Sequence, residues 1–365
     1  MIPLSIPHLG GNELKYVTEC IETGWVSSAG AYVTQFENMV AEFSGNKFGV
    51  AASSGTSGLH LAMHMLGIEK GDIVLVPNIT FIASANAVAY TNATPVFIDV
   101  DPETWQMDLD LLEEWLDDHN SPMVKAVMPV HVLGNMCNMP KLMDIALRHG
   151  LHVIEDSTEA LGSYWNGESA GSYGTMNVFS FNGNKIITTG GGGVIVTNDE
   201  DHAKRAKHLS TQSKVDPETY FHDEIGFNYR LVNVLAAIGV AQMEQLPEFI
   251  KKKKEIDAYY RENLEGVGDI KFQKVEKEVD PNCWLFTFYS EKQAEILAAL
   301  KENKIIARPF WYPMNQLPMF VDNEYVTKND HARNIHKNCL SIPSSVNLTE
   351  DDLAAVVRVV KTCFP

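Results

Sequence analysis

The sequence lacks an excess of positive charge and long apolar runs. Its 365 residues carry a net charge of −18, so it offers no broad basic surface that could displace counterions from a phosphate backbone. No apolar run is long enough to span a bilayer, and the first eleven residues lack the basic-then-apolar order of a secretory signal. We therefore expect neither a nucleic acid nor a membrane as a partner, and we expect a cytoplasmic location.

Cysteine is scarce and unpaired in the sequence. The five cysteines are scattered and include no Cys-x-x-Cys pair, a pattern that fits reduced thiols better than a disulfide framework or a zinc site. The histidines suggest no metal site either, because His331 and His336 are five positions apart and do not share one helical face. We therefore predict that the chain binds no metal.

Short apolar runs alternate with helical patterns through the first half of the chain. The predicted strands are Phe48–Ala52, Ile73–Pro77, 95–100, 124–130, 151–155, 176–181 and Gly193–Thr197. The predicted helices between them are 57–66, 81–90, 109–115 and 141–149. This alternation predicts an α/β domain with a mostly parallel sheet, in which ligands bind beyond the carboxyl ends of the strands.

The pattern changes near Pro247. A long polar helix at 251–264 precedes a strand at 283–289, a helix at 291–303, a strand at 305–309 and a final helix at 350–362. These elements predict a smaller α+β unit. We therefore divide the chain into a large domain, residues 1–246, and a small C-terminal domain, residues 247–365.

The segment 177–193 is the most unusual in the sequence. Lys185 follows an apolar strand and precedes four consecutive glycines, Gly190 to Gly193. Glycine at this density is kept where the backbone must turn tightly or approach a ligand. The order does not match a P-loop, and the glycines do not open a helix as in a dinucleotide fingerprint. Taken alone, the segment is also consistent with a glycine-rich hairpin beside a surface lysine.

Two further segments occupy positions that face ligands in α/β proteins. Asp156 ends an apolar strand, although a helix cap explains it equally well. The turn from Ser54 to Ser57 leads from a strand into a helix, and its N–H groups favour an anion, although a plain capping turn is equally consistent. Together with Lys185, these segments supply a phosphate cup, an acid for a pyridine nitrogen and an amine for a Schiff base. Pyridoxal 5'-phosphate requires these three groups.

The chain resembles the DegT/DnrJ/EryC1/StrS sugar aminotransferases, members of the aspartate-aminotransferase fold (fold type I). The motifs that carry the resemblance are, in order, 54–57, 80–86, 155–156, 180–185 and 226–230. It runs from Ile6 to Pro313 and continues more weakly to the C-terminus. The resemblance implies a fold type I structure, with the large domain binding the cofactor. It also implies transfer of an amino group from L-glutamate to a nucleotide-linked keto-sugar.

The resemblance also implies roles for individual residues. Lys185 would carry the cofactor as a Schiff base and move a proton, and Asp156 would pair with the pyridine nitrogen. Phe81 would stack on the cofactor, although a core aromatic is its alternative. The other expected cofactor contacts are Gly55, Thr56, Ser57, Glu159, Ser180 and Asn228, and the expected substrate contacts are Trp25, Ser28, Asn184, Arg308 and Trp311. Asn228 would reach the phosphate from a partner subunit, which implies a homodimer with shared active sites.

Three positions depart from the pattern of the family. Glu159 stands where Gln or His is frequent near the cofactor's phenolic oxygen, and a carboxylate there would have to be protonated or reoriented. Gly191 replaces a common glutamate, and Asn315 replaces a frequent histidine. These variants resemble the subgroup that acts on UDP-linked 4-keto-6-deoxy-N-acetylhexosamines, which supplies bacterial surface glycans and nonulosonic acids.

Other functions stay open at this level. A related cofactor-dependent dehydratase acts on the same keto-sugars, but such enzymes generally carry histidine in place of the lysine found at Lys185. A non-catalytic paralogue that binds a sugar nucleotide is another alternative, although every expected site residue is present. A sugar-phosphate dehydrogenase would suit the α/β pattern but would need the glycine fingerprint that the chain lacks.

Overall fold

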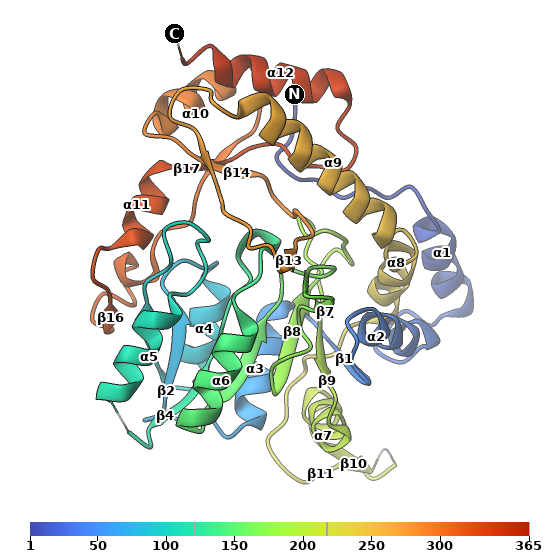
Figure 1. Cartoon of the computed structure of the whole chain (residues 1–365). Helices are drawn as coiled ribbons and strands as arrows, with labels where there is room; N and C mark the ends of the chain where they lie inside the picture. The colour runs from blue at the N-terminus through green and yellow to red at the C-terminus, as the bar shows by residue number, and fades with distance from the viewer. Residues whose placement is uncertain (120, 217, 365) are drawn as a thin grey trace.

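An eight-stranded sheet forms the centre of the larger part of the protein (Figure 1). The computed structural model describes residues 1–119, 121–216 and 218–364. In spatial order the strands are β1 (Phe48–Ala52), β9 (Gly193–Thr197), β8 (Met176–Ser180), β5 (His152–Asp156), β4 (Val124–Val127), β2 (Ile73–Pro77), β3 (Thr94–Ile98) and β16 (Tyr325–Val326). Only β9 runs against the others. The predicted α/β class with a mostly parallel sheet is confirmed.

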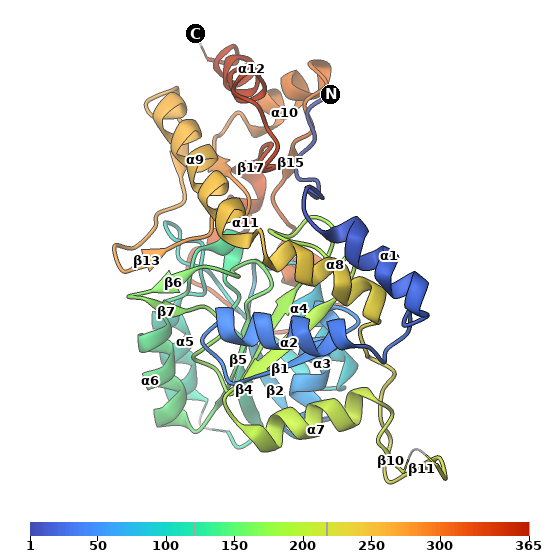
Figure 2. The ribbon, with the colours of Figure 1, turned by 90° about the vertical axis from the view of Figure 1, so that its right-hand side faces the viewer.

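Helices cover both faces of this sheet (Figures 1 and 2). One face carries α3 (Gly55–Met65), α4 (Ala83–Tyr90) and α7 (Glu200–Ser210), whose apolar residues share a core with β1, β2 and β8. The other face carries α5 (Leu109–Asp118) and α6 (Met139–His149). Beside them, α2 (Ala31–Phe43) packs on β1 and on α8 (Asn233–Met243), and α8 in turn packs on α1 (Glu13–Thr23). Burial of the sheet on both faces explains its continuous apolar strands.

Short polar motifs place the helix starts at the carboxyl ends of the strands. The Ser54 hydroxyl accepts a hydrogen bond from the Ser57 N–H, and the Ser57 hydroxyl accepts one from the Ser54 N–H, which forms a capping box at the start of α3. Asn138 caps α6 in a similar way, and Gly150 ends that helix in a left-handed conformation. Because β1, which precedes α3, runs in the same direction as β5, the carboxyl end of β5 and the N-terminus of α3 lie at the same edge of the sheet.

A second, four-stranded antiparallel sheet lies in the C-terminal part. Its order is β12 (Lys271–Phe272), β14 (Thr287–Tyr289), β17 (Cys339–Ser341) and β15 (Arg308–Pro309). The helices α9 (Leu246–Leu264), α10 (Gln293–Glu302) and α12 (Glu350–Lys361) enclose a separate core with it, and α11 (His331–Asn338) leads into β17. Figure 1 shows both chain termini at this end of the molecule.

Smaller elements complete the fold. A three-stranded sheet joins β13 (Val279–Asp280), β6 (Tyr164–Trp165) and β7 (Glu168–Ser169). The hairpin of β10 (Lys214–Asp216) and β11 (Phe221–His222) stands away from the body, as Figure 2 shows. Two 3-10 turns, η1 (Val132–Gly134) and η2 (Met314–Gln316), lie in loops. Among the described residues, no helix has both the length and the apolar character needed to cross a lipid bilayer.

Several expected elements are shorter than the sequence pattern indicates, such as the strand expected at 305–309, which forms only at Arg308–Pro309. Two of these differences bear on the site. The strand expected at 283–289 forms only at Thr287–Tyr289, because Cys283 has a positive φ of 54° and turns the chain away from the ladder. The helix expected at 81–90 begins at Ala83 and leaves Phe81 in the preceding turn. Both differences matter for the site, since they release Trp284 and Phe81 from regular structure.

The N-terminal segment pairs with the C-terminal part. Ile2 forms a parallel bridge with Ile305, and the Ser344 N–H donates to the Leu4 carbonyl at 2.8 Å. The division into residues 1–246 and 247–365 stays a prediction, and this segment connects the two sides of the proposed boundary.

Candidate active site

A cavity of about 310 Å³ opens at the carboxyl ends of β5 and β8. Such a position is where open α/β sheets bind ligands. Of the residues predicted from the sequence, the cavity is lined by Gly55, Thr56, Phe81, Glu159, Ser180, Asn184, Lys185 and Trp311. The structure thus brings together residues from segments that are far apart in the chain.

Lys185 lies in the loop between β8 and β9, and its side chain is 11% exposed. Its main-chain N–H donates to the Asn182 carbonyl at 3.0 Å, which makes a tight turn directly after the strand. The Nζ atom lies 3.5 Å from Glu159 Oε1 and 4.4 Å from the centre of the Trp284 ring. The amine therefore contacts both a carboxyl group and an aromatic face.

Glu159, the carboxyl group next to this amine, is 4% exposed. Its Oε2 accepts a hydrogen bond of 2.9 Å from the Leu133 N–H. Burial raises the pKa of Glu159 to about 7, although the charge of Lys185 and the Leu133 N–H act in the opposite direction. The carboxyl group can therefore hold a proton near neutral pH. A carboxyl group beside the phenolic oxygen of the cofactor would have to be protonated or reoriented.

Asp156 ends β5 and is 3% exposed. Its Oδ2 accepts a 2.6 Å hydrogen bond from the Ser84 hydroxyl, and its Oδ1 accepts one of 3.2 Å from the Thr158 N–H. These donors fix the carboxylate at the edge of the sheet beside the cavity. A fixed, buried carboxylate suits the pairing with a protonated ring nitrogen that pyridoxal phosphate needs.

The N-terminus of α3 forms one wall of the cavity. Gly55 and Thr56 are its first two residues, so their N–H groups have no partner within the helix and favour an anion. A Cβ on Gly193 would lie 2.5 Å from the Ser54 carbonyl oxygen, and one on Gly55 would lie 2.9 Å from Ser180 Cβ. Only glycine lets β9 and β8 approach the helix this closely. The resulting cup fits the phosphate group of the expected cofactor.

Ser57 has a different place from the one expected. Its hydroxyl donates to the Ser54 carbonyl at 2.9 Å and accepts from the Ser54 N–H, as part of the capping box. It is not among the residues that line the cavity. Ser54, which the sequence suggested only as part of the turn, lines the cavity instead.

Glu155 fixes the loop beyond the strand that carries Asp156. Its carboxylate accepts hydrogen bonds of 2.7 to 2.9 Å from the N–H groups of Gly171, Tyr173 and Gly174. His131 Nε2 lies 2.9 Å from the same carboxylate, and His131 Nδ1 accepts from a main-chain N–H, so the ring proton is on Nε2. This network gives a structural reason for the Glu155-Asp156 pair seen in the sequence.

Comparison with known proteins identifies the family. The profile of the DegT/DnrJ/EryC1/StrS aminotransferase family matches residues 7–361. The chain belongs to this family. It is therefore a nucleotide-sugar aminotransferase that depends on pyridoxal 5'-phosphate, and both the family and the cofactor predicted from the sequence are confirmed.

Individual members of the family cover nearly the whole chain. A GDP-perosamine synthase of Escherichia coli O157:H7 is 39% identical over 366 residues, which are 100% of this chain and 98% of that protein. A UDP-N-acetyl-3-dehydro-α-D-glucosamine 3-aminotransferase of Acidithiobacillus ferrooxidans is 34% identical over 89% of this chain and 86% of its own length. The crystal structure of S. venezuelae DesV in complex with a ketimine intermediate is 28% identical, with a TM-score of 0.89 over 96% of this chain and 94% of that chain.

Several residues expected in the site of this aminotransferase lie outside the cavity of the single chain. Asn228 is exposed and forms an antiparallel bridge with Thr211. Trp25, 57% exposed, and Ser28 lie between α1 and α2, and Arg308 lines a different cavity beside β15. The structure of one chain thus does not bring these four residues to Lys185.

Several residues of the aminotransferase site were not predicted from the sequence. These are Ser54, Ser84, Thr158, Asn182 and Trp284. Ser54 carries a recognisable signal as a helix cap followed by a glycine. Trp284 carries none, because it comes from the C-terminal part and reaches the cavity only through tertiary packing.

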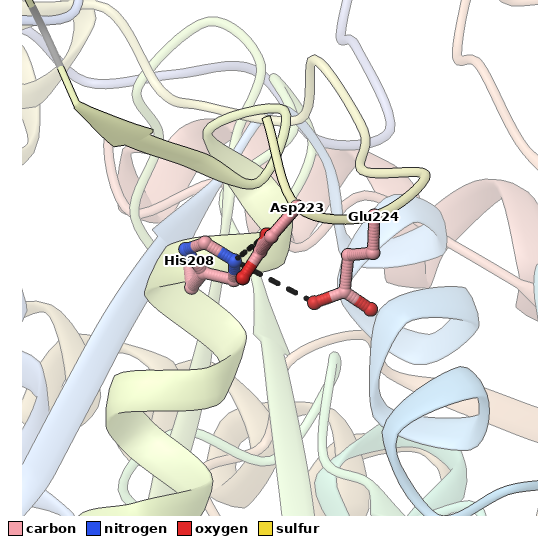
Figure 3. A group of neighbouring side chains, drawn as sticks. All are labelled: His208, Asp223 and Glu224. Carbon is pink, nitrogen blue, oxygen red and sulfur yellow. Dashed lines mark hydrogen bonds and ion pairs between the residues drawn. The ribbon is translucent and has the colours of Figure 1, made fainter. Parts of the chain in front are cut away.

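Figure 3 shows a cluster of potential metal ligands, none of which lines the cavity. The side chains of His208, Asp223 and Glu224 approach within 4.8 Å of one another, and no other group of three such side chains occurs in the part of the chain that the structure describes. His208 Nε2 lies 2.8 Å from Asp223 Oδ1, and Arg205 pairs with both carboxylate oxygens of Glu224. These pairs account for the cluster as a link between α7 and the segment after β11.

Proposed function

We propose that this aminotransferase moves an amino group from L-glutamate to a nucleotide-linked keto-sugar, with Lys185 as the cofactor lysine. The observation that carries the proposal is the position of Lys185. Its amine lines the same cavity as the N-terminus of α3 and lies next to the buried carboxyl group of Glu159. No other lysine lines this cavity among the residues described.

The residues around Lys185 would bind and orient the cofactor. Gly55, Thr56 and the Ser180 hydroxyl would hold its phosphate, and Asp156 would keep its ring nitrogen protonated. Phe81, 53% exposed at the edge of the cavity, is free to lie against the ring. When bound, pyridoxal phosphate supplies an electron-withdrawing ring that stabilises negative charge on the substrate carbon.

Protons in the transfer would move at Lys185 Nζ. With the cofactor bound, the largely buried amine of Lys185 would accept a proton from the substrate and return it. Glu159, 3.5 Å away, would stabilise the protonated form of that amine while the proton is held there. A dehydratase of the related kind is disfavoured, because it would carry histidine in place of Lys185.

We also propose that the active enzyme is a homodimer with shared sites. Asn228 is exposed, and large apolar side chains are exposed on the same segment and its hairpin: Val215, Tyr220, Phe221 and Ile225. Exposed apolar groups gathered in this way mark a protein interface. A second copy of the chain would cover them and receive Asn228 near its phosphate cup.

The acceptor is proposed in two forms. A GDP-linked keto-sugar is the first candidate, because the relative that matches 100% of the chain at 39% identity is named a GDP-perosamine synthase. A UDP-linked 4-keto-6-deoxy-N-acetylhexosamine is the second candidate, favoured by Glu159, Gly191 and Asn315 in the sequence. Either sugar would reach Asn184 and Trp311 at the mouth of the cavity, with Trp25, Ser28 and Arg308 as further proposed contacts.

A two-part experiment tests the function. The purified enzyme with bound cofactor is first titrated with L-glutamate, and the absorbance of the pyridoxal form should convert to that of the pyridoxamine form. A panel of GDP-, UDP- and dTDP-linked keto-sugars is then added, and the accepted one should restore the pyridoxal absorbance. Absence of any conversion by glutamate would favour a non-catalytic paralogue, and Lys185→Ala provides the inactive control.

A further inference from the structure

Lys253 is a buried amine that the proposed reaction does not use. It lies on α9, is 3% exposed, and donates hydrogen bonds to the main-chain carbonyl oxygens of Trp284, at 2.8 Å, and Ser344, at 2.5 Å. No carboxylate of the described residues lies within 4.0 Å of its nitrogen. Burial without a counterion lowers the pKa of Lys253 to about 7. Burying an apolar side chain would cost less free energy than burying this amine, so the contribution of Lys253 lies in the carbonyl groups that it binds.

One of these carbonyl groups belongs to Trp284, which touches Lys185 in two ways. The indole N–H of Trp284 donates to the Asn184 carbonyl at 2.7 Å, and that carbonyl is part of the peptide bond to Lys185. The Trp284 ring lies 4.4 Å from Lys185 Nζ. The Ser5 hydroxyl also donates to the Asn184 carbonyl, at 3.2 Å. A single side chain therefore holds the main chain of Lys185 and faces its amine.

The peptide groups of Trp284 are held from both sides. Its N–H donates to the Asn282 side chain at 2.9 Å, and its carbonyl accepts from Lys253. The Asn282 amide in turn donates to the Glu159 carbonyl at 2.8 Å. Trp284 lies outside any strand, so these side chains replace the ladder hydrogen bonds that would otherwise fix it.

We propose that Lys253 and Trp284 are positioning residues for Lys185, an inference that rests on the proposed function of this lysine. The π face of Trp284 stabilises a positive charge on the Lys185 nitrogen, and Lys253 keeps Trp284 in place by binding its carbonyl. Attraction between a cation and an indole ring at this distance favours the protonated nitrogen. The titratable group that also lies next to this nitrogen is Glu159, whose Oε1 is 3.5 Å away.

The test is a spectroscopic pH titration of the enzyme with bound cofactor, which reports the pKa of the Schiff-base nitrogen of Lys185. Trp284→Leu removes the π face and should lower this pKa by about one unit. Trp284→Phe keeps an aromatic face, so its pKa should fall by no more than half of that amount. Lys253→Met should lower the pKa in the same direction by a smaller amount, whereas Lys251→Met, an exposed lysine of the same helix, should leave it unchanged.

An unchanged pKa in Trp284→Leu, with cofactor bound, would overturn the inference. Should Lys253→Met fail to fold, the comparison of Trp284→Leu with Trp284→Phe still decides it, because equal shifts in both variants would exclude the π face as the cause. Failure of the proposed function has a different signature. In that case the unmodified enzyme shows no Schiff-base absorbance at all, or Lys185→Ala retains it.

Discussion

The Ser84 hydroxyl donates a 2.6 Å hydrogen bond to Oδ2 of Asp156, and it does so from the first turn of α4 to the end of β5. Both residues are almost completely buried. The same hydroxyl lies 2.8 Å from that of Thr80, so it is itself oriented. The carboxylate expected to face the cofactor ring is thus set by a helix that directly follows the turn carrying Phe81.

Removing either member of this pair should impair the reaction to different degrees. Asp156→Asn should lower kcat/KM by about a hundredfold or more, because an amide cannot stabilise a protonated ring nitrogen. Ser84→Ala leaves the carboxylate in place but less well oriented, and should cost about tenfold. Steady-state kinetics measure both effects. Ser44→Ala serves as the control and should retain activity, because the hydroxyl of this buried serine bonds to the Val40 and Ala41 carbonyls and to Asn46, away from the cavity.

The difference between Asp156 and Ser84 shows which parts of the site the sequence can predict. Asp156 and Gly55 follow from local pattern, because each lies where an apolar strand meets a turn and such ends converge at one edge of a parallel sheet, whereas Ser180 was expected from the family resemblance. Ser84 lies on a helix that was predicted, but its contact with β5 depends on how far α4 is rotated about its axis. That rotation is set by packing and leaves no mark in the order of residues.

Burial and packing also decide which elements of the rest of the fold can be predicted from the sequence. Seven of the eight strands of the large sheet, all except β16, were predicted because they are largely buried and mostly apolar. The helix α8 was not predicted, since it is apolar on all sides, lies between α1 and α2, and has no side-chain cap at its start. Trp284 illustrates the limit most clearly, because tertiary contacts of Asn282 and Lys253 hold it beside Lys185.

Glu159→Gln should change how stability depends on pH. The pKa of Glu159 in the folded protein is about 7, above its ordinary value of 4.5. The folded state therefore binds more protons than the unfolded state between pH 4.5 and 7, and the stabilising contribution is lost as the pH rises through this window. The variant has no titrating group at this position, so it does not show this fall in stability. Its unfolding free energy relative to that of the unmodified protein should thus increase by about 2–3 kcal/mol from pH 4.5 to 7.

Urea unfolding of the apoenzyme across this pH range measures the effect. The difference between the two proteins should stay constant above about pH 8, where Glu159 is ionised in both states. A difference that did not vary between pH 4.5 and 7 would show that the carboxyl group titrates normally despite its burial.

For Lys253, stability depends on pH in the opposite direction. Its pKa in the folded protein is about 7, below the ordinary 10.5, so the unfolded state binds more protons between pH 7 and 10.5 and stability rises with pH across that window. Lys253→Met has no such rise. The free energy of unfolding of the variant relative to that of the unmodified protein should therefore be highest near pH 7. It should fall by a few kcal/mol by pH 10, at about 1.4 kcal/mol per pKa unit. Parallel curves of unfolding free energy against pH for the two proteins would contradict this prediction.

Gly193→Ala should weaken cofactor binding. A methyl group there would lie 2.5 Å from the Ser54 carbonyl oxygen and would push β9 away from the start of α3. We expect the dissociation constant of the apoenzyme for pyridoxal phosphate to rise by about tenfold or more, which corresponds to about 1.4 kcal/mol. Gly183→Ala is the matched control, because nothing lies within 4 Å of the added carbon. Equal losses in both variants would mean that the approach of β9 does not shape the cup.

Mixed dimers can establish whether Asn228 serves the site of its partner. Lys185→Ala should abolish activity, and Asn228→Asp should impair it strongly, since a carboxylate would repel the phosphate. Refolding the two inactive variants together in equal amounts gives about half heterodimers, each with one site that has both native residues, so about a quarter of the original activity should return. A mixture of Lys185→Ala with the double variant contains no such site and should stay inactive. If Asn228 acted within its own subunit, no mixture would recover activity, because each site would then lack either its lysine or its asparagine.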